Sequence, residues 1–471
     1  MNMKVNKPEI DAKHELSKKM LNQAWLITGL LILFQMINFA DKAVLGLVAE
    51  SVMSELGMTS TQFGFIGSSF FFLFAISGII VGFIAGKVKT KWLILIMGGS
   101  WAILQFPMLL GGGAMALLVT RIVLGAAEGP ASSISLTHVQ GWFEPSVRGF
   151  PSSLVAAGTT IGPVVAAPIL AYIIAHPDLG WRWAFGFLGL VGIIWTVLWA
   201  IVSKEGPYSH FNGEKAEKNT SVPIIYDPNC KSIVNYVDLL KTVSIFKILF
   251  SKMFFSAFLA GLGCFWSLGF LTTWAPKYIA SIGTFSPEII ATVSSLPWIL
   301  GAISLAAAGY LSRILMKKGA TVHISLGIVF GLLVLISGIA FYLIPYLSGA
   351  ICIVLITIAA GFAMCFPLAT MAVGFSVSSK QRAAVMATLV ATSSIGGIVS
   401  PTMVGYFMDI AGYQQPAKGI PLVPVMAEKL IVGMNHGFEY IGIYMMIVGL
   451  ISILFLNPDN LVRKLRSIHI A

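Results

Sequence analysis

The amino-acid sequence predicts an all-α polytopic membrane protein with twelve transmembrane helices, arranged as two pseudo-symmetric six-helix bundles. The first observation is composition: of 471 residues, 57% are hydrophobic and only 10% are charged. A soluble domain carries roughly 25% charged residues, so this chain cannot cover a water-exposed surface. The second is a series of long apolar runs, and the third is a one-sided distribution of basic residues. Together they exclude a soluble enzyme, a disordered scaffold and a secreted disulfide-rich module. A transmembrane β-barrel is also excluded, because its strands would alternate apolar and polar residues.

The predicted spans follow from the apolar runs, since a helix that crosses a bilayer needs about 20 mostly apolar residues. Charged residues, proline and glycine separate one run from the next. The twelve spans are 24–49, 62–86, 91–111, 114–140, 150–175, 182–203, 252–276, 287–313, 321–344, 349–377, 382–409 and 437–457.

The basic residues predict the orientation of these spans. If the N-terminus is cytoplasmic, the cytoplasmic segments hold 24 of the 30 lysines and arginines, the outer segments hold four, and two lie inside helices. Cytoplasmic loops are expected to be enriched in lysine and arginine. The sequence therefore predicts a multi-pass protein of the inner or plasma membrane, surrounded by lipid, with both termini cytoplasmic. The net charge of +11 then reflects topology and does not indicate nucleic-acid binding.

The predicted organisation has five parts. They are a cytoplasmic N-terminus (1–23), an N-terminal bundle (24–203), a cytoplasmic linker (204–251), a C-terminal bundle (252–457) and a cytoplasmic tail (458–471). Apolar residues from Ile233 to Val243 recur at helical spacing, which predicts a helix at the membrane surface inside the linker. A second long polar loop is expected outside, over 410–436. Two parallel six-helix repeats are typical of transporters, with the substrate site between them near the midplane.

Four ionisable residues lie deep in the predicted spans: Asp41, Lys42, Arg121 and Glu128. Each such residue costs about 2.5–3.5 kcal/mol in a membrane, so it is a functional candidate by default. Their formal charges cancel, so they can exist as two compensating pairs. Arg121 and Glu128 are seven residues apart, which places them on one face of a helix about 10 Å apart in height.

These charges have two possible interpretations. The structural one is that buried salt bridges hold helices together, but buried ion pairs are weak stabilisers. The functional one is that Lys42 or Arg121 binds an anionic substrate group, with arginine better suited to grip a carboxylate. Asp41 or Glu128 would then carry the proton that couples transport to the proton gradient.

Other residues leave alternatives open. Trp266 is a candidate for lining the substrate cavity; Trp274 and Tyr278 could line it or anchor the helix at the membrane interface. His138 could transfer protons, but a packing role is favoured. None of the four cysteines forms a CxxC pattern and three lie in apolar runs, which favours packing over a metal or redox site. No metal site and no cofactor beyond the proton gradient is expected.

The sequence resembles the major facilitator superfamily, and within it the anion:cation symporter family, which includes transporters of sugar acids and aromatic acids and animal sialin. The most specific matches are Asn38-Phe39-Ala40-Asp41-Lys42, Arg121-x-x-x-Gly125-x-x-Glu128-Gly129-Pro130, Gly180-Trp181-Arg182-Trp183-Ala184-Phe185 and Thr273-Trp274-Ala275-Pro276-Lys277-Tyr278. The resemblance implies proton symport by alternating access. It also implies that Asp41 and Glu128 are protonation sites and that Lys42 and Arg121 handle the substrate carboxylate.

The sequence departs from the family pattern in two respects. Gly86 and Arg313 stand where an aspartate usually follows spans 2 and 8, which puts the cytoplasmic charge relay in doubt. Sugar-acid members often carry tyrosine where this chain has Phe39 and Phe74, and asparagine near Ser393 and Ser394 in span 11. Each lost phenol removes a hydroxyl-binding group, and a site for a polyol needs such groups. The expected substrate is therefore less hydroxylated than a hexonate, for example an aromatic or short-chain acid.

The sequence thus predicts a monomeric secondary transporter that imports a small organic anion with protons. The alternative is a proton-driven antiporter that exports an anionic or amphipathic compound, because Gly158-x-x-x-Gly162-Pro163 partly resembles the antiporter glycine-proline element. An enzyme is not expected, since the chain has no HExxH and no GxSxG motif.

Overall fold

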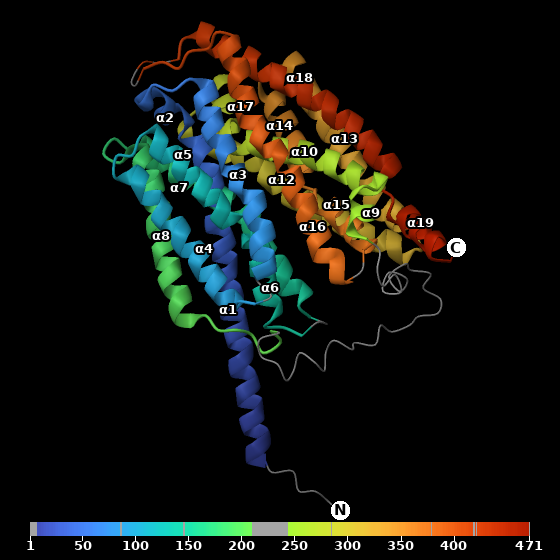
Figure 1. Cartoon of the computed structure of the whole chain (residues 1–471). Helices are drawn as coiled ribbons and strands as arrows, with labels where there is room; N and C mark the ends of the chain where they lie inside the picture. The colour runs from blue at the N-terminus through green and yellow to red at the C-terminus, as the bar shows by residue number, and fades with distance from the viewer. Residues whose placement is uncertain are drawn as a thin grey trace, which may run out of the picture.

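The computed structural model is helical throughout the part of the chain that it describes (Figure 1). The described residues are 7–84, 87–144, 147–209, 244–283, 285–377, 379–417, 420 and 422–470. The surface helix predicted over Ile233 to Val243 lies outside these residues, as do Cys230 and Gly86. The three described cysteines are buried and unpaired.

Twelve described helical segments are long and apolar enough to cross a membrane, which confirms the predicted number. The first six consist of α1 (Lys7–Leu47), α3 (Ser60–Ile84), α4 (Thr90–Leu109), α5 (Ala114–Glu128) with α6 (Ala131–Gln140), α7 (Gly149–Ala175) and α8 (Gly180–Val202). The second six consist of α10 (Lys252–Thr273), α12 (Pro287–Lys317), η4 (His323–Ile328) with α13 (Val329–Leu343) and η5 (Ile344–Tyr346), α14 (Ala350–Ala363) with α15 (Pro367–Phe375), α16 (Ser379–Ser393) with α17 (Ile395–Ile410), and α18 (Pro424–Phe455). Shorter helices are α2 (Ala49–Leu56), α9 (Ile245–Leu249), α11 (Ala275–Ser281) and α19 (Pro458–Ile470).

The prediction of a polar outer loop over 410–436 is wrong for its second half, from Pro424 onward. The last span, α18, already begins at Pro424 and runs for 32 residues. Pro424 occupies the first turn, where its missing N–H costs no hydrogen bond. Leu430, Gly433 and Met434 are buried on one face of this extension. The polar residues beside them, Glu428 and Lys429, lowered the local hydropathy and so concealed the helix.

Two prolines lie at breaks within the spans. Span 4 changes from α5 to α6 at Gly129 and Pro130, and span 10 changes from α14 to α15 directly before Pro367. Proline has no backbone N–H to donate to the carbonyl of residue i−4, and its ring clashes with that carbonyl, so it favours a break in a helix interior. Pro163, Pro168, Pro297 and Pro401 instead lie inside helices.

Glycines allow the spans of the first bundle to pack with their backbones in contact. A Cβ atom on Gly125 would lie 1.8 Å from the Phe70 carbonyl oxygen of α3. One on Gly162 would lie 2.3 Å from the Met36 carbonyl oxygen of α1, and one on Gly158 would lie 2.6 Å from that of Ile32. Such close approach is the usual role of small residues in membrane helices. Close packing of α1 and α7 therefore accounts for the Gly158 and Gly162 pattern without antiporter chemistry.

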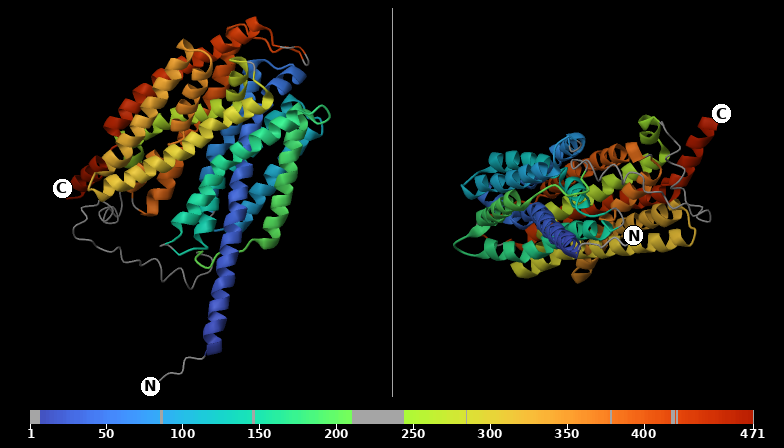
Figure 2. Two further views of the ribbon diagram at one scale, coloured as in Figure 1. Left: turned by 180° about the vertical axis from the view of Figure 1, so that it is seen from behind. Right: turned by 90° about the horizontal axis from the view of Figure 1, so that it is seen from below.

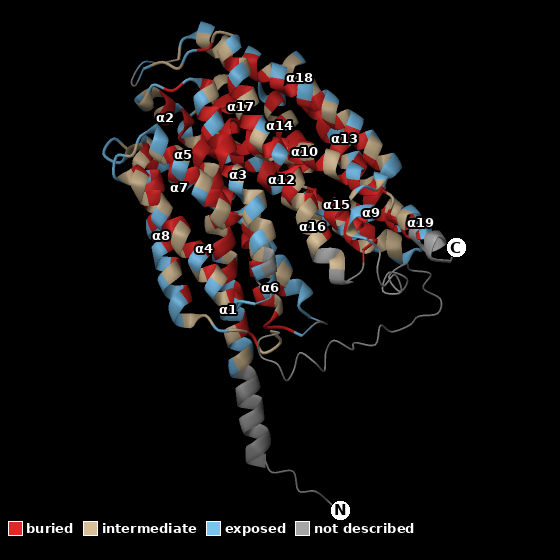
Figure 3. Ribbon diagram, in the orientation of Figure 1, coloured by how far each residue is buried: buried red, intermediate tan, exposed pale blue. Residues whose placement is uncertain are grey.

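The two groups of six helices lie side by side, with blue-to-green helices next to yellow-to-red ones (Figures 1 and 2). The buried residues concentrate where α3, α10 and α17 meet between the two groups (Figure 3). We call the end that holds the start of α3 and the end of α17 the outer end, following the predicted orientation.

The outer end is closed by direct contacts between the two bundles. The carboxylate of Asp409, at the end of α17, accepts hydrogen bonds from the backbone N–H groups of Ser60 and Thr61 at 3.0 and 2.8 Å, and from the Thr61 hydroxyl at 2.6 Å. These N–H groups begin α3, so a carboxylate of one bundle caps a helix of the other. Further along the same interface, the hydroxyls of Ser68 and Thr402 lie 2.8 Å apart.

Candidate functional site

The four buried charges meet at the centre of the first bundle, but they pair differently from the simplest expectation. The ammonium of Lys42 on α1 forms an ion pair with the carboxylate of Glu128 on α5. The same ammonium donates a hydrogen bond to Asn38 Oδ1 at 2.7 Å. Asn38 and Lys42 are one helical turn apart on α1, so both face α5. Three of the predicted site residues therefore form one contact group.

Arg121 and Asp41 do not form the second compensating ion pair. Arg121 Nη1 donates to the backbone carbonyl oxygen of Asp41 at 3.0 Å. In the described part of the chain, the Asp41 carboxylate has no ion-pair partner within 4.0 Å, although the residue is only 1% exposed. The expectation of two closed pairs is thus wrong. The reason is that the neighbouring positions 41 and 42 point in different directions on a helix, and only Lys42 faces Glu128.

Aromatic rings surround the Lys42 ammonium. Its Nζ lies 4.3 Å from the ring centroid of Phe39 and 5.5 Å from that of Phe70. The Phe39 ring in turn packs edge-on against Trp298 of the second bundle, with 5.8 Å between centroids. Cation–π contacts stabilise an ammonium where water is excluded. Phe39 therefore lies beside the Lys42 ammonium, although its ring offers no hydroxyl group.

A small cavity between the bundles reaches both basic residues. Its volume is about 10 Å³, and its lining includes Lys42 and Arg121 from the first bundle and Thr272 and Thr273 from the second. Apolar side chains complete the wall: Leu45, Phe70, Phe71 and Leu268. A volume of this size admits about one water molecule. The site must therefore enlarge before any organic molecule can bind.

Several buried polar atoms of three of the four charged residues and of Asn38 have no hydrogen-bonding partner among the described residues. They are Asp41 Oδ1, Asn38 Nδ2, Arg121 Nη2 and Glu128 Oε1. Leaving a buried polar atom unpaired costs about 1–3 kcal/mol, and more for a charged group. A cluster of unpaired donors and acceptors is a feature of sites that bind a ligand or exchange a proton.

The remaining predicted residues lie outside this contact group. Phe74 is on α3, with its ring 5.6 Å from that of Phe70. Trp266 is buried in the second bundle, where it stacks on Phe270 and contacts Phe341 edge-on. Ser393 and Ser394 are fully buried near the break between α16 and α17. Trp266, Ser393 and Ser394 do not line the central cavity.

Sequence reasoning missed the second bundle's contribution. Thr272 and Thr273, the two residues at the end of α10, line the cavity in place of the predicted serines. The signal was present as two adjacent hydroxyl residues closing an apolar span, directly before Trp274. Trp274 and Tyr278 are 0% and 1% exposed, so neither is an interfacial anchor. Trp274 Nε1 instead donates to the Pro401 carbonyl oxygen at 2.8 Å.

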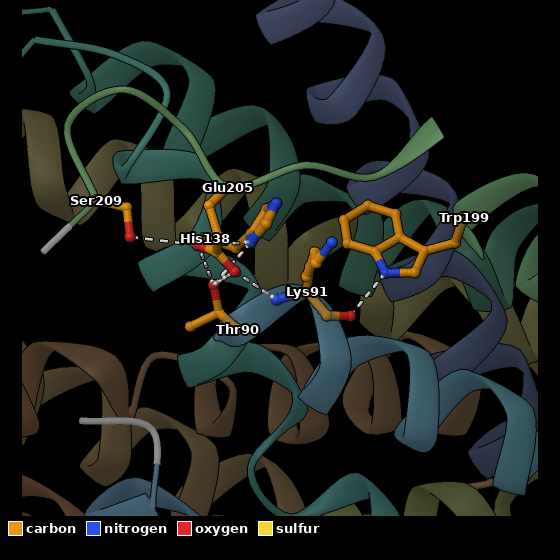
Figure 4. Close-up of polar contacts among 6 residues, drawn as sticks. All are labelled: Thr90, Lys91, His138, Trp199, Glu205 and Ser209. Carbon is orange, nitrogen blue, oxygen red and sulfur yellow. Dashed lines mark hydrogen bonds and ion pairs between the residues drawn. The ribbon is translucent and has the colours of Figure 1, made fainter. Parts of the chain in front are cut away.

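His138 lies at the inner end of the first bundle, in a cluster with Thr90 and Glu205 (Figure 4). Its Nδ1 is 2.7 Å from the Thr90 hydroxyl and 4.0 Å from the Glu205 carboxylate. Glu205 also accepts a hydrogen bond from the Lys91 N–H at 2.9 Å, which caps the start of α4. The cluster ties the segment after α8 to α4 and α6. This arrangement favours the packing interpretation of His138.

Lys277 forms a second, unexpected polar site at the outer end. It lies on α11 and is only 7% exposed, and its ammonium donates to Gln415 Oε1 at 2.6 Å. Burial lowers the pKa of Lys277 to about 8, while the negative charge of Glu50 opposes that shift. At neutral pH the group is therefore still predominantly an ammonium ion.

Comparison with known proteins agrees with this architecture. A profile of the Major Facilitator Superfamily matches residues 31–401. The chain is 29% identical over 290 residues to a hexuronate transporter of Bacillus subtilis, covering 62% of this chain and 64% of that protein. It is 23% identical over 445 residues to a probable sulfoacetate transporter of Cupriavidus necator, covering 94% and 95%. It is 27% identical over 407 residues to a probable galactarate/D-glucarate transporter of Bacillus subtilis, covering 82% and 86%.

Solved structures share the same fold at low sequence identity. A bacterial homologue of the human lysosomal transporter Spinster, in an inward-facing conformation, superposes with a TM-score of 0.72 at 16% identity, covering 94% of this chain and 98% of that one. The inward-open xylose transporter XylE of Escherichia coli gives 0.68 at 14% identity, covering 94% and 99%. The chain belongs to the Major Facilitator Superfamily and is a membrane transporter, not an enzyme.

Proposed function

We propose that this transporter imports a small organic anion together with protons. The central observation is the Lys42–Glu128 ion pair beside a cavity that also holds Arg121. Two cationic side chains at one cavity suit a substrate that carries one or two acidic groups. The names of the relatives, which include hexuronate, galactarate and sulfoacetate transporters, support the same substrate class.

The ion pair supplies a route for coupling substrate to protons. While Glu128 is ionised, it neutralises the Lys42 ammonium and competes with any substrate anion. When Glu128 accepts a proton, Lys42 loses its counter-charge and becomes free to bind a carboxylate. The substrate anion then replaces Glu128 as the partner of Lys42, and proton and anion occupy the site together. Because Asp41 is buried and no described basic group forms an ion pair with its carboxylate, it is the candidate for a second protonation site.

The lining of the cavity favours an acid with few hydroxyl groups. Phe70, Phe71, Leu45 and Leu268 provide apolar walls, and the hydroxyls of Thr272 and Thr273 are the polar groups of the second bundle there. A polyol chain needs a donor or acceptor for each hydroxyl, since a buried unpaired hydroxyl is costly. Sulfoacetate carries two anionic groups and no hydroxyl, so it is a better model substrate for this cavity than a hexuronate.

We also propose that the protein lies in the inner membrane with both termini cytoplasmic and works as a monomer. The exporting antiporter remains the alternative direction of flux. The packing of Gly158 and Gly162 against α1 removes the feature that favoured it.

Uptake into proteoliposomes tests the proposal. Labelled sulfoacetate, galacturonate, galactarate and benzoate are offered with and without an inward proton gradient. We expect at least one acid to accumulate, and only when the gradient is present. Arg121→Lys, which keeps the charge but loses the planar two-donor grip, should weaken this uptake. If no acid accumulates, the importer proposal fails; if preloaded acid leaves in response to the gradient, the antiporter is correct.

A further inference from the structure

A second cavity lies at the outer end, between the two bundles. Its volume is about 290 Å³, close to the lower range of small-molecule pockets. Glu50 and Ser51 of α2 and Ala171 and Ile174 of α7 line it from the first bundle, while Pro276 and Lys277 of α11 line it from the second. Because both bundles contribute, the cavity must change shape when the bundles move.

Lys277 lines this cavity, and its ammonium has no contacting counter-charge among the described residues. In the described part of the chain, no carboxylate lies within the 4.0 Å ion-pair distance of its Nζ. Its contacts are Gln415 Oε1, at 2.6 Å, and the Tyr413 ring, whose centroid is 5.4 Å away. The Tyr413 hydroxyl donates to the same Gln415 oxygen at 2.7 Å. Glu50 acts electrostatically on Lys277 without contacting it. The ammonium, with one neutral acceptor among the described residues, retains unused donors that an anion would satisfy.

Residues that lie close together in the chain line the outer and the central cavities. Leu45 lines the central cavity and the next residue, Gly46, lines the outer one. Likewise Thr273 lines the central cavity and Pro276 the outer one. The two bundles are in direct contact between these cavities, since a Cβ on Gly46 would lie 2.8 Å from the Thr272 carbonyl oxygen.

We propose that Lys277 and the outer cavity form an external anion-binding site that captures the substrate carboxylate before it passes to Lys42 and Arg121. The substrate class rests on the proposed function above. Glu50 lines the same cavity from the opposite bundle and is exposed to solvent. Its negative charge repels an arriving anion, so Glu50 limits affinity at the site that Lys277 provides.

Sidedness of transport kinetics tests the inference. Sulfoacetate and galacturonate uptake is measured in right-side-out vesicles, where the outer face is presented, and in inverted vesicles, where the inner face is presented. For Lys277→Met we expect the KM at the outer face to rise about tenfold, the effect of losing one charge-assisted hydrogen bond. The KM at the inner face should be unchanged. Lys277→Arg should retain most of the outer affinity, and Glu50→Gln should lower the outer KM.

Occupancy of the cavity is measured independently of transport. Ala280, which also lines it, is replaced in Ala280→Cys and labelled with a membrane-impermeant maleimide from outside. Sulfoacetate should slow this labelling, and Lys277→Met should remove the protection. Equal KM changes at both faces, or no change at either, would overturn the inference, as would protection that persists in Lys277→Met. If wild-type protein transports neither acid, the proposed function fails instead, so the two failures are distinguishable.

Discussion

Glu128→Gln is the substitution that separates the structural and coupling roles of the central ion pair. The glutamine keeps the size of the side chain and an acceptor oxygen for the Lys42 ammonium, but it removes the charge and the titratable proton. The variant therefore imitates a transporter whose Glu128 is permanently protonated. We expect it to exchange substrate across the membrane but not to accumulate it in response to a pH gradient.

The energetic cost follows from the surroundings of Lys42. This residue is 8% exposed, so its charge cannot be compensated by water. Removing one partner of a buried ion pair costs about 3–5 kcal/mol. Because the ammonium keeps Asn38 Oδ1 at 2.7 Å and the Phe39 ring at 4.3 Å, we expect a loss of about 3 kcal/mol, the lower end of that range. The double variant Lys42→Met/Glu128→Gln has no buried charge at this point and should recover most of that stability, while losing anion binding.

The effect on transport is equally defined. One pH unit corresponds to 1.36 kcal/mol per proton, which is a tenfold concentration ratio. With one proton carried per anion and no membrane potential, wild-type protein should accumulate substrate up to about tenfold across one pH unit. Vesicles with Glu128→Gln should reach equal substrate concentrations on the two sides, an accumulation ratio of about one. The exchange rate of this variant should not change between about pH 6 and about pH 8.

Two assays on the same purified variants measure these quantities. Thermal unfolding in detergent reports stability, and proteoliposomes loaded with unlabelled sulfoacetate report exchange and gradient-driven uptake. Glu55→Gln is the matched control, because Glu55 pairs with Arg182 at 2.8 Å where both side chains are about a quarter exposed. A partly exposed pair contributes about 0–1 kcal/mol, and the glutamine oxygen can still accept the hydrogen bond that Trp181 Nε1 donates to Glu55 at 2.9 Å. This control should therefore unfold near the wild-type temperature and keep its uptake. Tenfold accumulation by Glu128→Gln, or a stability loss no larger than that of Glu55→Gln, would refute the reasoning.

Four further substitutions probe other parts of the molecule. Asp41→Asn should abolish gradient-driven uptake but keep exchange; unchanged accumulation would exclude Asp41 as a coupling group. Arg121→Lys should raise the substrate KM at both membrane faces by about tenfold or more, since a two-donor grip is lost, whereas a normal KM would contradict its anchoring role. Asp409→Ala removes the interbundle cap of α3 and should lower the free energy of unfolding by about 2 kcal/mol. A cysteine placed at Thr272 should then be labelled faster from the outside. Equal labelling in both proteins would count against a closed outer end. Gly162→Val should lower the unfolding temperature by several degrees, because the valine Cβ would overlap the Met36 carbonyl. An unaltered unfolding temperature would show that the two helices can separate freely.

The span count and the four buried charges could be predicted because each depends on local properties of the chain. An apolar run of about 20 residues defines a span whatever surrounds it. An ionisable residue inside such a run stands out by its cost, so Asp41, Lys42, Arg121 and Glu128 were identifiable from sequence. The early start of α18 was missed for the same reason, because Glu428 and Lys429 interrupt the apolar run although the helix continues.

Contacts between helices could not be predicted, because they depend on how each helix is rotated and packed. The sequence places Asp41 and Lys42 side by side, but only the fold decides that Lys42 meets Glu128 and that Arg121 meets the Asp41 carbonyl oxygen. The same holds for Thr272 and Thr273, which reach the central cavity where Ser393 and Ser394 were expected. Lys277 belongs to a recognisable motif, yet its burial depends on Gln415, 138 residues away in sequence.

Proton movement during substrate uptake tests the central claim most directly. Proteoliposomes containing a trapped pH-sensitive dye receive external sulfoacetate or galacturonate, with no imposed pH gradient and with the membrane potential clamped by potassium and valinomycin. If anion and proton enter together, internal pH falls as substrate enters wild-type vesicles and stays constant in Glu128→Gln vesicles that still exchange substrate. Substrate entry without internal acidification, or with alkalinisation, would contradict proton symport through the Lys42–Glu128 pair.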